Sequence, residues 1–137
     1  MLGCSEELGP ERFETTDLSG RVYSLNGPIT SGWVEFFPTD GTMGNLTTAR
    51  IGADGRYVAR RVPVGRVAIS LVGIPAQMFR TPGGPVPSTV FQLGSSPIRR
   101  TVGAGTASSL DLDLSVEAVR FLEERQGRAR AAGGTGG

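Results

Sequence analysis

The chain has 137 residues and a formal net charge of +1, from 14 basic and 13 acidic residues. It contains no histidine, no lysine and one cysteine, which excludes a Ser-His-Asp triad, a histidine-bound metal, a lysine Schiff base and an internal disulfide within this chain. The near-zero charge gives no electrostatic reason to expect nucleic acid. We therefore expect no enzymatic activity and no cofactor.

The first four residues, MLGC, resemble the end of a bacterial lipoprotein signal, where a small residue precedes the cysteine that becomes acylated. The charged and apolar regions that precede such a site do not occur in this chain. The following residues are polar and suit a tether. The alternative is an unstructured N-terminus with an incidental thiol. We predict lipid attachment at Cys4, with residues 1–16 as the tether. No apolar run of the sequence approaches the roughly 20 residues that are needed to span a bilayer.

Five β-type runs lie between residues 18 and 73, separated by Gly, Pro, Asn and Asp at intervals of about ten residues. This spacing predicts an all-β sandwich. The run at residues 46–51 is expected at an edge, the Asp54-Gly55 pair predicts a hairpin, and the run at residues 67–71 is expected to be central. The side chains that we expect in the core are Val22, Val34, Phe36, Val67, Ile69, Leu71, Leu110 and Leu112.

Residues 74–94 break this regularity, because four prolines and Gly83-Gly84 interrupt any continuous helix or central strand. We expect a long loop that is functional or disordered, with Met78, Phe79 and Arg80 at its middle. Order is expected to return at residues 97–102 and at residues 109–114, where leucine alternates with aspartate.

A short helix is predicted after this last run, with Ser115 as its N-cap and Glu117 in its first turn. Residues 127–137 are rich in Gly, Ala and Arg, and we expect them to fray as a flexible tail. The apolar stripe of the helix packs either on its own domain or on another chain. The helix residues that we expect to contact a partner are Val119, Arg120, Phe121 and Leu122.

Taken in order, several motifs resemble those of the carboxypeptidase regulatory-like (transthyretin-like, prealbumin-type) sandwich, above all its small exported or lipid-anchored bacterial versions. These motifs are SGRV at residues 19–22, NGPI at 26–29, GWVEFFP at 32–38, ADGRY at 53–57, VPVG at 62–65 and LDLDL at 110–114. The resemblance covers residues 17–114 and implies a seven-stranded antiparallel, Ig-like sandwich. For stand-alone members it implies structural or interaction roles without enzymatic activity. Residues 115–137 draw no support from it.

Three further patterns have a structural and a functional interpretation. Asp111 and Asp113 are expected to solvate one face of a strand rather than bind calcium, which needs more oxygen ligands. Trp33, Phe37 and Tyr57 form a binding face for a sugar or a partner, or are mostly buried by one sheet; we expect burial. The arginines that either gather into an anion-binding patch or solvate a sheet face are Arg60, Arg61, Arg66, Arg99 and Arg100.

Two functions from different classes remain. The first is a structural or interaction module at the periplasmic or outer surface of a bacterial membrane, an accessory subunit of a larger protein complex. Its partner contacts are expected at Met78, Phe79 and Arg80 and at the helix residues named above. The second is a module that binds carbohydrate, peptide or a small hydrophobic molecule through residues 74–94.

Overall fold

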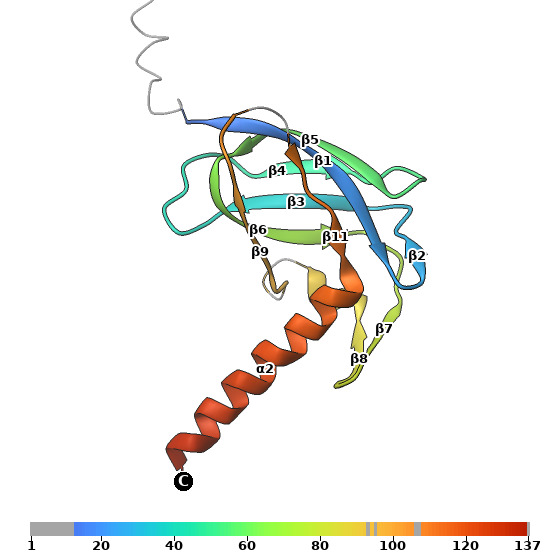
Figure 1. The fold of residues 1–137 in the computed structure, drawn as a ribbon, viewed down its shortest axis with the longest axis vertical. Coiled ribbons are helices and arrows are strands. Elements are labelled where there is room, and N and C mark those ends of the chain that lie inside the picture. Colours follow the sequence, from blue (N-terminus) through green and yellow to red (C-terminus); the bar gives the residue numbers. More distant parts are fainter. Residues whose placement is uncertain (1–12, 93, 95, 106–107, 137) are drawn as a thin grey trace, which may run out of the picture.

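The computed structural model describes residues 13–136, apart from residues 93, 95 and 106–107, with side chains described as far as residue 128. The described chain is mostly β, with two sheets that enclose one hydrophobic core, a small hairpin and a C-terminal helix (Figure 1). The all-β expectation is confirmed at this level.

One layer is an antiparallel sheet of four strands in the order β4-β3-β6-β9, which we call the four-stranded sheet. Burial alternates along β3: Val34 and Phe36 point into the core, while Trp33 and Phe37 lie on the outer face. The central position of β6 and the edge position of β4 agree with the sequence prediction. The strands are β3 (Trp33–Pro38), β4 (Thr47–Arg50), β6 (Gly65–Val72) and β9 (Ile98–Val102).

The other layer is organised around β1 (Thr15–Ser24), and we call it the β1 sheet. Two strands pair with β1 antiparallel, namely β5 (Arg56–Pro63) and β2 (Gly27–Pro28). Two short strands pair with it in parallel, namely β10 (Ser108–Ser109) and β11 (Leu112–Asp113). The core between the layers is as expected: seven of the eight predicted side chains are buried, and Leu110 is half-buried against them.

Between β10 and β11 the regular ladder with β1 is interrupted: the Leu110 amide still donates to the Ser19 carbonyl at 2.8 Å, and side chains make the other contacts. The Arg21 amide donates to Asp111 Oδ1 at 3.0 Å, and the Tyr57 hydroxyl donates to the Leu110 carbonyl at 2.6 Å. Burial, with Asp111 nearby, raises the pKa of Tyr57 above its usual range, so the hydroxyl stays a donor. A Cβ at Gly20 would lie 1.9 Å from the Leu110 carbonyl oxygen, so only glycine allows this approach.

Several expectations about the strands were wrong. The described residues form eleven strands rather than seven, and two of them, β10 and β11, each pair with β1 in parallel. Asp54-Gly55 does not close a hairpin, because β4 pairs with β3 in one layer and β5 pairs with β1 in the other. The turn therefore crosses between the layers, held by a hydrogen bond from the Gly52 amide to the Arg56 carbonyl at 2.8 Å.

The two remaining segments lie at one end of the sandwich. Residues within 74–94 form the antiparallel hairpin of β7 (Met78–Thr81) and β8 (Gly84–Pro87), followed by a 3₁₀ turn at Ser88–Phe91, so the expected irregular loop was wrong. Helix α2 (Leu114–Gly136) has 23 residues and extends away from the sheets (Figure 1). The short helix with a frayed tail was also wrong, since no proline interrupts this Ala- and Arg-rich segment.

Candidate functional site

The β7–β8 hairpin is defined by a tight turn at Pro82 and Gly83. The Thr81 hydroxyl donates to the Gly84 carbonyl at 2.7 Å and accepts from the Gly83 amide at 3.1 Å. Proline presets the backbone at the start of the turn and glycine relaxes its second half, so these residues favour a turn rather than a disordered loop.

The inner face of the hairpin belongs to the core. Phe79 is 1% exposed, Val86 faces it across the ladder, and the Phe79 and Phe91 rings meet edge to face with centroids 5.7 Å apart. Phe79 is therefore a packing residue of its own domain, which differs from the expectation that it is an exposed anchor for a partner. The reason is the two-residue period of the strand, which separates Phe79 from its neighbours Met78 and Arg80.

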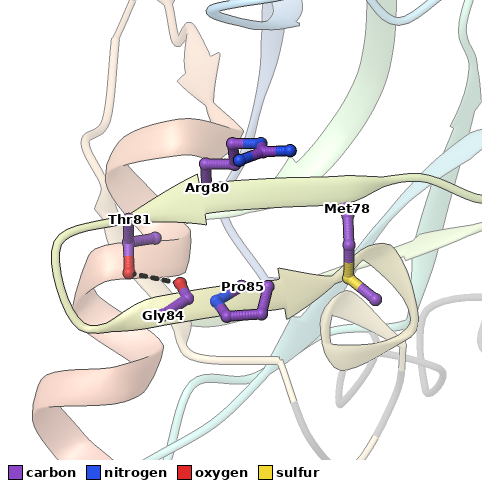
Figure 2. A pocket seen from close by; sticks show the side chains of 5 residues that line it. All are labelled: Met78, Arg80, Thr81, Gly84 and Pro85. Carbon is purple, nitrogen blue, oxygen red and sulfur yellow. Dashed lines mark hydrogen bonds between the residues drawn. The ribbon is translucent and has the colours of Figure 1, made fainter.

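The outer face of the hairpin carries an open recess of about 490 Å³. Met78, at 55% exposed, and Pro85 give it an apolar wall, and Arg80 adds a cation. Figure 2 shows Met78 and Arg80 on β7 with Pro85 on the neighbouring strand, and the Thr81–Gly84 hydrogen bond that closes the end. An apolar recess beside a guanidinium is suited to anchoring a side chain or a small molecule.

Helix α2 is attached to the sandwich through its first turns. Asp113, not Ser115, is the N-cap, because Asp113 Oδ1 accepts from the amides of Ser115 at 3.0 Å and Val116 at 3.4 Å. Ser115 instead accepts, through its hydroxyl, from the Leu25 amide at 2.9 Å. The expected N-cap was therefore wrong by two residues, and the aspartate expected to solvate a strand face begins the helix.

A buried ion pair links the helix to the four-stranded sheet. Glu117 is 1% exposed, and its Oε2 accepts from Arg100 Nη2 of β9 at 2.5 Å. Its Oε1 has no hydrogen-bond partner among the described residues and faces Arg120 Nη1 at 3.5 Å. A carboxylate in this position needs both cations, because burial of an unpaired charge is costly.

The helix and the hairpin, separated by some thirty residues of sequence, lie side by side. Phe121 and Leu122 are half-buried against the core, and a Cβ on Gly83 would lie 3.2 Å from Leu122 Cδ1. Val119 is also half-buried, while Arg120 is exposed. The structure thus brings the two predicted contact segments together into one surface, which we call the hairpin–helix surface.

Other candidate residues have structural partners or lie outside the described residues. Asp111 pairs with Arg21, and among the described residues no group of three or more His, Cys, Asp or Glu lies close enough to hold a metal ion. The arginine patch is not formed as a unit, since Arg60 pairs with Asp17 and Arg66 with Asp40. Cys4 lies outside the described residues.

Sequence reasoning missed two features. The first is the buried ion pair of Arg100. The two-residue period of β9 indicates it, because Arg100 lies on the same face as the inward-facing Ile98 and Val102. The exposed positions of Trp33 and Phe37 correct our expectation of burial, although their alternation with Val34 and Phe36 already indicated the outer face. In the part of the chain that the structure describes, no helix combines the length and hydrophobicity that crossing a bilayer requires.

No protein-family model matches this chain, and no curated protein matches it. A solved structure with a similar arrangement is a DUF3823 family protein from Parabacteroides merdae, with 12% sequence identity and a TM-score of 0.44. The alignment covers 74% of this chain and 46% of that chain, so the matched region is less than half of the other protein.

Proposed function

We propose that this domain is a non-enzymatic interaction module, an accessory subunit that joins a larger complex through the hairpin–helix surface. The single observation that supports the proposal most is the packing of two segments, distant in sequence, into one surface with an apolar recess and exposed arginines. The contact residues in this proposal are Met78, Arg80, Val119, Arg120, Phe121 and Leu122. Phe79 acts from beneath, by holding the hairpin in place.

The geometry favours docking for two reasons. The hairpin is fixed to the core through Phe79 and Val86, so little conformational entropy is lost when its outer face is covered. Met and Arg are also enriched at protein interfaces. Beyond Leu122 the described side chains of α2 as far as residue 128 are exposed, which leaves a helical surface open next to the recess.

The test is co-purification from native membranes with a tagged chain. The double variant Met78→Ala with Arg80→Ala should lose the specific partners while its melting temperature stays unchanged, because both side chains are exposed. Leu25→Ala is the matched control, since Leu25 is the most exposed large apolar residue of the described chain and lies outside the surface. Identical partner sets for the wild type and the double variant would overturn the proposal.

We also propose that the module acts at a bacterial membrane surface, with Cys4 acylated and no transmembrane helix needed for attachment. The support is the MLGC sequence with the polar residues after it. One acyl chain binds a membrane only marginally, so protein contacts or further chains would complete the anchor. Intact-mass spectrometry of the native protein is the test, and an unmodified Cys4 preceded by Met1 would contradict it.

The closer relation to the carboxypeptidase regulatory-like, transthyretin-like sandwich is likewise a proposal. It is supported by the order of the motifs and by the two layers. In one layer the short strands β10 and β11 lie one after the other along an edge of β1, and in the other layer four strands form the opposite sheet. An experimental structure that superposes the two layers strand by strand on members of that family, with a shared connectivity, is the check.

A second function rests on the recess itself, which could hold a small hydrophobic molecule, a peptide or a sugar. Methyl NMR of the methionines distinguishes it from protein docking. A ligand in the recess should shift the Met78 methyl signal and leave that of Met43, which is 62% exposed and outside the recess, unchanged. Equal shifts at both methyl groups would indicate nonspecific binding and contradict this function.

A further inference from the structure

A second recess, which no residue of the hairpin lines, lies beside the outer face of the four-stranded sheet. It has a volume of about 570 Å³ and lies next to Trp33, which is 46% exposed. Apart from Arg50 the lining is uncharged, and most of its other residues are small, among them Thr30, Ser31, Gly52 and Gly73. The recess therefore combines one aromatic ring, one cation and a hydroxyl- and backbone-rich wall.

Arg50 differs from most exposed arginines of the sandwich. Arg21, Arg56, Arg60 and Arg66 each lie within 4.0 Å of an aspartate carboxylate. Arg50 has no such partner among the described residues, and its guanidinium carbon lies 6.0 Å from the centroid of the Trp33 ring. The ring orients the guanidinium without neutralising it, so its charge stays available to an anion.

Glycine keeps the space beside the Trp33 ring open. Gly73 follows Val72, the residue that pairs with Trp33 across the ladder, and has a φ of +70°. A Cβ there would lie 4.0 Å from Trp33 Cδ1, so any larger side chain would start to fill the edge of the recess. The hydroxyls of Thr30 and Ser31 have no hydrogen-bond partner among the described residues and are exposed to this space.

We propose that this recess binds a sugar ring that carries a carboxylate, a uronic acid of a polysaccharide. The apolar C–H face of a pyranose stacks on the Trp33 ring, whose π face is electron-rich. The Arg50 guanidinium binds the carboxylate through charge-assisted hydrogen bonds. The hydroxyls of Thr30 and Ser31 exchange hydrogen bonds with the hydroxyls of the sugar.

Charge decides between an acidic and a neutral sugar. Among the described residues that line the recess, Arg50 is the one cation and none is a carboxylate; the nearby Asp54, next to Gly52, pairs with Arg56. Glu35 projects from the next outward position of β3, opposite Thr48 and Ser70, and it disfavours an anion on that side. The carboxylate of the sugar therefore lies on the side of Arg50 that faces away from Glu35. The inference does not depend on the hairpin–helix surface.

Trp33 is the only tryptophan of the chain, so its fluorescence reports on this recess directly. Titration of the full chain with a galacturonic acid hexamer should change the emission, and xylohexaose, a neutral hexamer, should change it less. Affinity measured by calorimetry should fall about tenfold or more for Arg50→Gln, the loss expected for one charge-assisted hydrogen bond, and this loss should be confined to the acidic hexamer.

Trp33→Ala should abolish binding of both hexamers. Phe37→Ala is the matched control, an exposed aromatic on the same face and roughly 13 Å further along the strand, and it should bind like the wild type. All three side chains are exposed, so the melting temperatures should agree. An unchanged affinity in Trp33→Ala or Arg50→Gln would overturn the proposal, and so would no binding of the acidic hexamer or tighter binding of the neutral one.

Discussion

The two layers of the sandwich are built by different means. In the four-stranded sheet every pairing is antiparallel, and the register runs without a shift. In the β1 sheet the register with β5 shifts between Thr16 and Leu18, and the opposite edge of β1 meets two separate strands. At both interruptions an aspartate replaces a backbone carbonyl: Asp17 accepts from the Arg61 amide at 3.1 Å, and Asp111 accepts from the Arg21 amide.

This difference shows two ways of stabilising a layer. The four-stranded sheet depends on alternating burial, which any apolar residue of suitable size maintains. The β1 sheet depends on particular residues at its interruptions, namely two aspartates, a glycine and a tyrosine hydroxyl. Mutations should therefore act by burial in the first layer and by residue identity in the second.

The largest expected effect sharpens the description of the four-stranded sheet. Phe36 is 0% exposed and Phe37 is 39% exposed, so two neighbouring phenylalanines face opposite sides of β3. Phe36→Ala should lower the free energy of unfolding by about 3–5 kcal/mol. Phe37→Ala should cost less than about 1 kcal/mol, as expected for a surface position. Urea melts measure both values, and equal losses would mean that the outer face is also packed.

The next effect concerns the ion pair of Glu117 and Arg100, which joins helix α2 to β9 of the four-stranded sheet. Glu117→Gln keeps the size of the side chain but leaves Arg100 without its counter-charge. The cost should be about 3 kcal/mol, the lower end for breaking a buried pair, because the Arg100 side chain is 25% exposed. Glu123→Gln, on the exposed side of the helix, is the matched control. Indistinguishable melts for the two variants would show that the pair contributes nothing.

The four-stranded sheet is the part of the fold that the sequence predicted best. Alternation and turn residues located β3, β6 and β9 and most of the core, because burial on one face leaves a period of two in the sequence. The sequence did not predict the two strands that pair with β1 in parallel, because a strand of two residues is too short to show an alternating pattern. Asp54-Gly55 was misassigned because a tight turn looks the same whether it joins strands of one sheet or of two.

The candidate site was predicted only in outline. Residues 78–80 and 119–122 were named from composition, and the structure brings their segments together. That Phe79 points inward followed from strand periodicity, but the prolines obscured the strand. The pairing of Glu117 with Arg100 depends on tertiary contact, which no local pattern records.

A third prediction tests the dependence of the β1 sheet on residue identity. Gly20→Ala places a methyl group against the Leu110 carbonyl, so β1 and the segment that joins β10 to β11 must separate there. The expected loss is about 1–3 kcal/mol, as for overpacking. Gly103→Ala is the control, because a Cβ there meets no atom of the described residues within 4 Å and its φ is not positive. It should be neutral or stabilise by up to about 1 kcal/mol, and a loss as large as that of Gly20→Ala would contradict the steric explanation.

The smallest effect has the opposite sign and concerns the shift of register in β5. Arg61 has a φ of +60°, a conformation that costs a residue with a Cβ about 1–2 kcal/mol. The position is held because the Arg61 amide donates to Asp17 and the Arg61 carbonyl accepts from the Thr47 hydroxyl at 3.3 Å.

Arg61→Gly retains both backbone contacts and removes the strain, while the added freedom of the unfolded chain costs about 0.5–1 kcal/mol. The net result should be a gain of about 0.5–1 kcal/mol in urea melts. Arg60→Gly, one residue earlier and outside the left-handed region, receives the entropic cost and also loses the exposed ion pair with Asp17, so it should lose about 1 kcal/mol. The difference between these neighbours reports mainly on backbone strain, because each variant removes one arginine from the same strand and an ion pair between exposed side chains contributes little. If Arg61→Gly destabilises the protein as much as Arg60→Gly does, the left-handed residue is not strained, and the irregular layer stores no conformational energy at this position.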